Sequence, residues 1–207
     1  METQSQARKI LVTGASGYVG GRLVRDLLND HQQVRILVRD KNKVLGQVWA
    51  AHVEIVEGNA TNSADLDRAL EGIHTAFYLM HSINVGTNYD AIESEMAKGF
   101  AAAAERAGIS QIVYLGGIAN DENRSRHLTS RMNTGKELTK GATPVLELRA
   151  GIIIGSGSAS FEMLRHLTHR LPIMTTPKWV SNRTQPIAIR DVLYYPVSYT
   201  HLTLPTK

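Results

Sequence analysis

The hydrophobic positions of the chain follow two alternating patterns. Short apolar runs bounded by polar residues or glycines are typical of buried strands, and longer segments with apolar residues every three or four positions are typical of amphipathic helices. The expected strands cover residues 8–13, 33–38, 53–57, 75–80, 111–115, 145–149 and 184–189. The expected helices cover residues 18–29, 64–71, 89–106, 128–140 and 161–170, and a further helix opens at residues 190–192.

This alternation of strands and helices predicts the fold class. Parallel strands need crossover helices, which pack on both faces of the sheet through right-handed connections. We therefore expect an α/β protein with a Rossmann-type doubly wound parallel sheet and helices on both faces. No internal repeat or low-complexity linker precedes residue 192, so one domain is expected over residues 1–195.

A glycine-rich turn joins the first expected strand to the first expected helix. This turn contains glycines at every third position, Gly14, Gly17 and Gly20, and Ser16 and Tyr18 lie between them. Glycines let backbone N–H groups approach a pyrophosphate, and the helix N-terminus that follows adds partial positive charge. The turn stands between a strand and a helix, with a second strand at βαβ distance, as in the dinucleotide-binding fingerprint. These five residues are predicted to bind cofactor; the alternative is a tight turn without a ligand.

The end of the second expected strand bears on the choice of cofactor. An acidic residue about 20 positions after the glycine turn suits the ribose of NAD, whereas an arginine suits the 2′-phosphate of NADP. Arg39 occupies this position, and Asp40 beside it leaves NAD open. We predict NADP(H) in preference to NAD(H); the alternative is that Arg39 is an ordinary surface arginine.

Further site residues are expected where the other strands end, because ligands of doubly wound sheets lie at the carboxyl ends of the strands. His81 is a candidate acid or base, since an imidazole titrates near neutral pH; the alternative is a structural histidine. The segment 150–160 is expected to pass over the nicotinamide side and to shape a substrate pocket. The cofactor contacts expected at these ends are Asn59, Ala60, Leu79, Met80, His81, Gly116 and Gly151.

The composition narrows the class of protein. Of 207 residues, 43% are hydrophobic and 20% are charged, which is ordinary for a globular domain. There is no cysteine, which excludes disulfides and thiolate metal sites, and the formal net charge of +4 is mild. We expect no metal site, no nucleic-acid partner and no membrane span, and a cytoplasmic protein whose N-terminus lacks a signal-peptide core.

Several runs of residues carry a resemblance to a known family. Residues 11–20, with the pattern TGxxGxxG, resemble the start of the atypical or extended short-chain dehydrogenase/reductase superfamily. Residues 127–137, 147–158 and 184–192 resemble a narrower bacterial branch, the NmrA-like NAD(P)H-binding proteins. The resemblance covers about residues 8–195 and implies a dinucleotide cofactor.

One departure from the superfamily limits what the resemblance implies about catalysis. Catalytic members carry Tyr-x-x-x-Lys, but none of the seven tyrosines here has a lysine four residues later. The corresponding helix holds His127 and Arg131, and glycines 116 and 117 stand where the superfamily has a serine. The remaining catalytic candidates are His127, Arg131 and His81, and Arg131 is also expected to bind the cofactor ribose or phosphate.

Three functions follow from these features. The first is an NAD(P)(H)-dependent oxidoreductase of atypical mechanism that acts on a small organic substrate. The second is a non-catalytic module that senses the NADP(H) pool or scaffolds a protein partner, as NmrA-like regulators do. The third is an isomerase or epimerase with a tightly held cofactor. The missing tyrosine–lysine pair counts against the third and favours the second, whereas the segment 150–160 favours the first.

The C-terminal residues of the sequence do not share the resemblance to this family. Residues 197–207 fit no element of the branch and resemble translated sequencing-adapter sequence. We therefore expect residues 196–207 to be a non-native or disordered tail, and the domain to be truncated at its C-terminal end.

Overall fold

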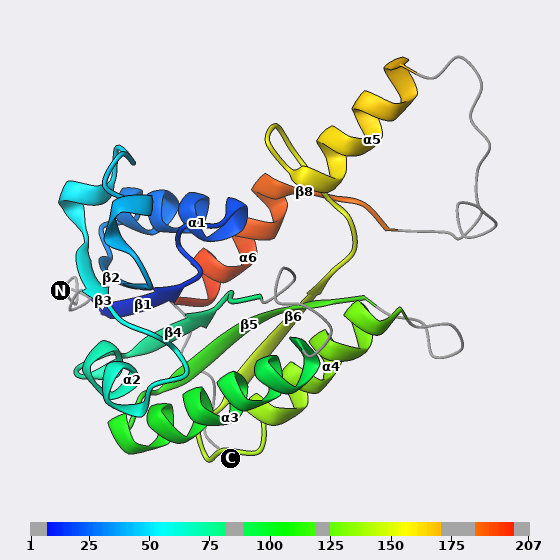
Figure 1. Ribbon diagram of the computed structural model, residues 1–207. Coiled ribbons are helices and arrows are strands. Elements are labelled where there is room, and N and C mark those ends of the chain that lie inside the picture. The colour runs from blue at the N-terminus through cyan, green and yellow to red at the C-terminus, as the bar shows by residue number, and fades with distance from the viewer. Residues whose placement is uncertain (1–7, 82–88, 119–124, 171–184, 201–207) are drawn as a thin grey trace, which may run out of the picture.

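A six-stranded parallel sheet forms the centre of the computed structural model (Figure 1), which describes residues 8–81, 89–118, 125–170 and 185–200. The strand order is β3-β2-β1-β4-β5-β6, and every neighbouring pair is parallel. This order reverses between β1 and β4, as in the doubly wound dinucleotide folds. The strands are β1 (Lys9–Thr13), β2 (Gln33–Val38), β3 (Glu54–Glu57), β4 (Thr75–Tyr78), β5 (Gln111–Gly117) and β6 (Val145–Ala150).

Helices cover both faces of the sheet, which confirms the predicted fold class. One face carries α1 (Tyr18–Asn29) and α6 (Ile189–Thr200), and the other carries α2 (Ser63–Leu70), α3 (Tyr89–Ala107) and α4 (Arg126–Leu138) (Figure 1).

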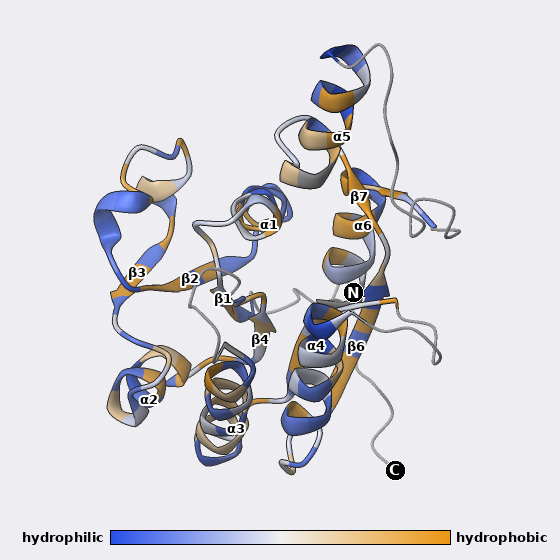
Figure 2. Ribbon diagram, turned by 45° about the vertical axis from the view of Figure 1, so that its right-hand side comes forward, coloured by the Kyte–Doolittle hydropathy of each residue, from blue (hydrophilic) through white to orange (hydrophobic). Residues whose placement is uncertain are grey.

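Alternate strand residues supply the two cores, because successive side chains of a strand point to opposite faces. In β1, Ile10 and Val12 pack on the α1 side together with Leu23 and Leu27, whereas Leu11 packs on the side of α2 and α3. The inner strands are therefore nearly continuous apolar segments between more polar helices (Figure 2), as expected for strands buried on both faces, whereas the edge strands β3 and β6 are partly exposed.

Smaller elements complete the described chain. Two short 3₁₀ helices, η1 (Lys41–Lys43) and η2 (Ala50–His52), lie between β2 and β3. A separate two-stranded parallel sheet pairs β7 (Ile153–Ile154) with β8 (Ile187–Ala188). Helix α5 (Ala159–Arg170) projects away from the main sheet (Figure 1). Among the described residues, no helix is both long and apolar enough to cross a membrane.

The structure corrects several expected boundaries. Strand β4 ends at Tyr78 rather than at residue 80, because the N–H of Leu79 donates to the Thr13 hydroxyl (3.2 Å) instead of to a neighbouring strand. Strand β5 continues to Gly117 because β6 pairs with it there. The helix expected to open at residue 190 instead starts at Ile189 and runs to Thr200, and Val197 packs against the core on the α1 side. Residues 201–207 lie outside the described residues.

Candidate functional site

The candidate site begins where the strand order reverses, at the carboxyl ends of β1 and β4. The hydroxyl of Thr13 donates to the carbonyl of Phe77 (2.9 Å) and accepts from the N–H of Leu79 (3.2 Å). Thr13 is fully buried, so both hydrogen bonds are shielded from water. One side chain thus fastens the two strand ends that border the crevice expected in this fold.

The glycine turn is held closed by contacts that only glycine permits. Gly14 has a φ of +69°, and a Cβ there would lie 2.5 Å from the carbonyl oxygen of Leu79. A Cβ on Gly20 would collide with the carbonyl of Gly14, and Gly20 is buried. Gly14 and Gly20 are therefore required by the packing of the turn itself.

Gly17 differs from these two glycines, because its free side faces outward. Its φ of −86° and ψ of 171° suit any residue, and a Cβ there would meet only the Gly14 carbonyl oxygen, at 3.2 Å. Gly17 is the N-cap of α1; no side chain caps this end of the helix, and its first turn has no acidic residue. The first N–H groups of a helix lack intrahelical acceptors, so this end fits a phosphate group.

At the end of β2, the side chains of Arg39 and Asp40 have different surroundings. Arg39 is exposed. The carboxylate of Asp40 accepts a hydrogen bond from the N–H of Asn42 (2.9 Å) and thereby caps the η1 turn. The acidic side chain that could hold a ribose is therefore already engaged in the local backbone.

The end of β3 brings Asn59 and Ala60 to the same edge of the sheet. The side-chain oxygen of Asn59 accepts from the N–H of Thr61 (3.1 Å), and its own N–H donates to Asp65 (2.8 Å). Ala60 is buried in the core between the sheet and α2 and α3. Asn59 is exposed at the strand end, whereas Ala60 offers little surface to a ligand.

On the other side of the switch point, Arg131 connects three elements. It extends from α4, donates through Nη2 to the carbonyl of Leu115 in β5, and places Nη1 2.7 Å from Nε2 and 3.0 Å from Nδ1 of His81. The hydroxyl of the buried Tyr114 donates to the carbonyl of Arg131 (2.8 Å). His81 and Arg131, which were predicted from separate motifs, therefore come together.

The electrostatics of this cluster favour neutral histidines. Partial loss of hydration, followed by the charges of Arg131 and His127, lowers the pKa of His81 to about 3, although the residue as a whole is exposed. Burial and the charge of Arg131 also lower the pKa of His127, and Glu93 opposes this shift. A neutral imidazole has one acceptor nitrogen, which matches its position against the guanidinium of Arg131.

The glycines at the ends of β5 and β6 serve close packing. A Cβ on Gly116 would lie 2.7 Å from a carboxylate oxygen of Glu147. A Cβ on Gly151 would collide with the carbonyl of Gln185, so the segment leading into β8 crosses directly over residue 151. Leu79 and Met80 lie between these glycines and the turn and are half-buried.

The segment 150–160 turns toward α1. The carbonyl of Ser156 accepts a hydrogen bond from Arg22 (2.8 Å), and a Cβ on Gly155 would collide with the phenol oxygen of Tyr18. These two contacts with α1 lie beside the outer end of the glycine turn.

A family model described as NAD(P)H-binding matches residues 14–143, which begin in the glycine turn and end beyond α4. The match covers more than half of the chain. The chain belongs to this NAD(P)H-binding family. Its predicted resemblance to short-chain dehydrogenase/reductase-type NAD(P)H-binding proteins is therefore confirmed.

Several curated relatives of this NAD(P)H-binding chain are named as reductases or dehydrogenases. It is 28% identical over 169 residues to the ceramide reductase of Caulobacter vibrioides, covering 80% of the present chain and 52% of that protein. It is 37% identical over 128 residues to the (4-alkanoyl-5-oxo-2,5-dihydrofuran-3-yl)methyl phosphate reductase of Streptomyces griseus, covering 62% and 41% of the two chains. The chain thus spans about half the length, or less, of these relatives.

Solved structures share the fold of the NAD(P)H-binding chain. The Bordetella bronchiseptica enzyme WbmG, in complex with NAD and UDP, matches with a TM-score of 0.78 at 15% identity, over 100% of this chain and 73% of that one. The triphenylmethane reductase of Citrobacter sp. matches with a TM-score of 0.64 at 22% identity, over 78% and 54%. At these identities the likeness concerns the fold alone.

Sequence reasoning missed two side chains of the NAD(P)H-binding domain. Glu93 on α3 is only 5% exposed and accepts a hydrogen bond from the hydroxyl of the buried Ser130 on α4. The sequence holds a signal for this burial, because Glu93 lies three residues before Met96 and seven before Phe100 and so shares one face of the helix with them. The other missed residue is Thr13, the threonine of the TGxxGxxG pattern, whose hydrogen bonds to the end of β4 depend on the neighbouring strand.

Proposed function

We propose that this chain is the NADP(H)-binding domain of an oxidoreductase that acts on a small organic substrate. The observation that carries the proposal is the uncapped helix N-terminus at Gly17, beside the switch point of the sheet. The names of the curated relatives, several of which are reductases or dehydrogenases, support an oxidoreductase over other dinucleotide-binding proteins.

The preference for NADP(H) rests on the end of β2. Arg39 is exposed and free to reach a 2′-phosphate, whereas the Asp40 carboxylate is engaged by the N–H of Asn42. An arginine binds phosphate bidentately through charge-assisted hydrogen bonds. A ribose hydroxyl would share the Asp40 carboxylate with the η1 cap, which already takes Oδ1.

Each part of the site has a proposed role. The N–H groups at the start of α1 hold the pyrophosphate, with Ser16, Gly17 and Tyr18 next to it. Arg131 orients the ribose or phosphate from the β5 side. A bound nicotinamide cofactor supplies or accepts the hydride. His127 is the candidate proton donor one helical turn from Arg131, and His81 lines the nicotinamide side.

The lowered pKa of His127 gives the proposal a pH signature. Burial and the charge of Arg131 favour the neutral ring, and only the protonated ring can donate a proton to a reduced substrate. Turnover in the reductive direction should therefore rise as the pH falls below neutral, until the fold itself loses stability.

The alternative function is a non-catalytic module that senses the NADP(H) pool. It is favoured by the absence of any tyrosine–lysine pair and by the engagement of Arg131 with the Leu115 carbonyl and His81. Such a module would bind cofactor without oxidising it.

The test begins with calorimetric titration of the purified chain with NADPH and with NADH. We expect tighter binding of NADPH, and we expect Arg39→Ala to weaken NADPH by about tenfold or more while leaving NADH unchanged. Arg165→Ala, in the projecting helix α5, is the matched control. Equal weakening of both cofactors would refute the 2′-phosphate role, and failure of the chain to bind either cofactor would refute the proposal.

A second step separates the two functions. Oxidation of NADPH is followed by nicotinamide absorbance in the presence of quinones and small carbonyl compounds. Turnover that falls in His127→Gln supports the oxidoreductase. Tight binding without turnover, in a chain extended to the full length of its relatives, favours the sensing module.

A further inference from the structure

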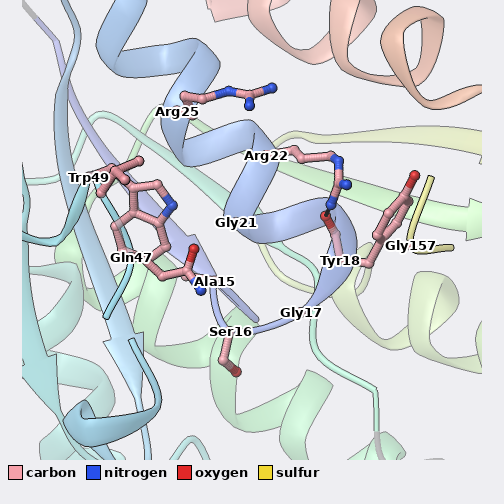
Figure 3. A pocket seen from close by; sticks show the side chains of 11 residues that line it. Ala15, Ser16, Gly17, Tyr18, Gly21, Arg22, Arg25, Gln47, Trp49 and Gly157 are labelled. Atoms are coloured by element: carbon pink, nitrogen blue, oxygen red, sulfur yellow. Dashed lines mark hydrogen bonds between the residues drawn. The ribbon is translucent and has the colours of Figure 1, made fainter. Parts of the chain in front are cut away.

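A second feature of the domain lies on the outer side of the glycine turn. A pocket of about 490 Å³ opens over the first turns of α1 (Figure 3). We call it the arginine pocket. It is lined by Ala15, Ser16, Gly17, Tyr18, Gly21, Arg22, Arg25, Gln47, Val48, Trp49 and Gly157.

The hollow exists because two lining positions of α1 lack side chains. Gly17 and Gly21 are one helical turn apart and both line the pocket. A Cβ on Gly21 would already lie 3.2 Å from the carbonyl oxygen of Ala15 and 3.9 Å from Trp49. In Figure 3, Trp49 lies on one side of the helix and Tyr18 on the other, and the backbone at Gly21 lies between them.

The charge of the arginine pocket is positive. Arg22 and Arg25 lie among its lining residues, and no carboxylate lines it in the described part of the chain. Within the part of the chain that the structure describes, the ion pair of Arg25 is with the neighbouring Asp26, at 3.5 Å between partly exposed groups, which compensates its charge weakly.

Arg22 is positioned in advance by neutral partners. Its guanidinium stacks 3.9 Å from the centre of the Tyr18 ring and donates to the carbonyls of Tyr18 (3.2 Å) and Ser156 (2.8 Å). None of these partners carries a negative charge, and a guanidinium has five N–H donors. Arg22 is therefore held in place while its charge remains available to an anion.

We propose that the arginine pocket binds a phosphate group. Arginine pairs match the geometry and charge of phosphate, and the uncapped start of α1 adds partial positive charge at one end of the pocket. The volume exceeds that of one phosphate, so an organic part of the ligand would lie against Trp49. The phosphate belongs either to the 2′ position of NADP, reaching outward past Ser16, where Arg22 and Arg25 would take the role proposed above for Arg39, or to a separate phosphorylated ligand. The inference rests on the proposed function only in the first case.

The experiment uses Arg22→Met combined with Arg25→Met, which keeps the length of both side chains and removes their charge. Calorimetry compares adenosine 2′,5′-bisphosphate with 5′-AMP, a pair that differs only in the 2′-phosphate. If the phosphate is that of NADP, the double variant binds the bisphosphate about tenfold or more weakly and 5′-AMP unchanged. Arg190→Met, on an exposed arginine of α6, is the control for net charge.

A second arm tests the separate ligand. Inorganic phosphate is titrated into protein saturated with NADPH, whose 2′-phosphate occupies the arginine pocket if it belongs there and leaves the pocket open if it does not. Saturable phosphate binding that is lost in the double variant supports a separate phosphorylated ligand. Retention by the double variant of wild-type affinity for both the bisphosphate and phosphate would overturn the proposal, as would the absence of phosphate binding and of any bisphosphate advantage in the wild type.

Two further measurements keep these outcomes interpretable. Arg25→Met alone leaves the contacts of Arg22 with Tyr18 and Ser156 intact, so it tests the pocket if the double variant does not fold, and it should weaken the phosphate probe in the same direction. If the wild type binds neither NADH nor NADPH, the proposed function fails. In that case inorganic phosphate, titrated without NADPH, still tests the arginine pocket.

Discussion

The two sides of the switch point differ in their exposed groups, which are backbone groups on one side and side chains on the other. On the β1 side, the chain presents a helix N-terminus and glycines, and the fit to an anion comes from backbone geometry. On the β4 and β5 side, the surface consists of side chains, with Arg131 placed between the carbonyl of Leu115 and the ring of His81.

Under the proposed function, this difference separates cofactor binding from catalysis. Backbone N–H groups do not titrate, so the glycine turn can hold a phosphate over a wide pH range. The Arg131 side depends on protonation, because burial and positive charge lower the pKa of both His81 and His127. Substitutions on the two sides should consequently have different signatures, and the following predictions use that contrast.

The largest effect is expected from Gly14→Ala. The substitution places a Cβ against the Leu79 carbonyl oxygen and forces a φ of +69° on an L residue. We expect a loss of about 3 kcal/mol in the free energy of unfolding, measured with urea. Gly72→Ala is the control, because Gly72 has a φ of +68° but no atom within 4 Å of a Cβ, so it should lose only about 1 kcal/mol. Equal losses would mean that the contact with Leu79 is unimportant.

Gly17→Val should act on binding alone. Its backbone suits valine, and within the protein the Cβ meets only the Gly14 oxygen, so the circular dichroism spectrum should not change. The new side chain would occupy the place of the phosphate and weaken NADPH and NADH by about 100-fold or more. Gly46→Val serves as control, since a Cβ on Gly46 meets nothing within 4 Å. Retained affinity would show that the phosphate binds elsewhere.

Arg131→Met should change a titration rather than the fold. Removing the guanidinium removes one cause of the lowered pKa of His81, so the pKa should rise from about 3 toward its ordinary value, as followed by NMR. Arg126→Met, on the same helix but paired with Asp90, should leave the pKa of His81 unchanged. An unchanged pKa in Arg131→Met would contradict the contact between the two residues.

The lowered pKa of His81 also predicts how the free energy of unfolding changes with pH. The folded-state pKa of His81 lies below its unfolded value of about 6.5, so the unfolded chain binds more protons between these values. The free energy of unfolding of the wild type should therefore fall as the pH falls below about 6.5. This fall should be shallower in Arg131→Met.

The smallest effect is expected at the start of α4. The hydroxyl of Ser125 accepts from the N–H of Leu128 (3.3 Å) and caps the helix that carries His127 and Arg131. Ser125→Ala should cost about 1 kcal/mol of stability, and it should affect the titration of His127 but not phosphate binding at the glycine turn. Weakened binding of phosphate would mean that the two sides are coupled.

The glycine turn and helix α1, on the β1 side of the switch point, could be predicted from the sequence in detail. The glycine spacing of residues 14–20 fixed the turn, and the periodicity of residues 18–29 gave α1 with the same bounds as the structure. These features depend on local geometry, which a sequence states directly. The sequence did not reveal that Gly14 serves internal packing while Gly17 faces outward, because that depends on the position of Leu79.

The cluster of side chains on the β4 and β5 side of the switch point was predicted only in outline. His81 and Arg131 were each expected near the cofactor, but their contact depends on how α4 packs over the ends of β4 and β5. Glu93 was missed because one charged residue in a stripe of apolar positions is usually exposed, whereas here Ser130 on the facing helix supplies a hydrogen bond. Asp40 was left open as a ribose ligand, and its role as a cap requires knowledge of the η1 backbone.

The packing of α6 against α1 has a consequence for how the chain is made. The two helices share one apolar cluster, in which Leu193 joins Leu23 and Leu27, yet residues 30–188 separate them in the sequence. At about 5–20 residues per second, ribosomal synthesis of that stretch takes roughly 8–30 s. During this interval the outer strip of α1 has no α6 to cover it, so the first βαβ unit is exposed to chaperones and to aggregation until nearly 200 residues have been made. The order of synthesis thus leaves the helix of the glycine turn among the last parts of the domain to become fully packed.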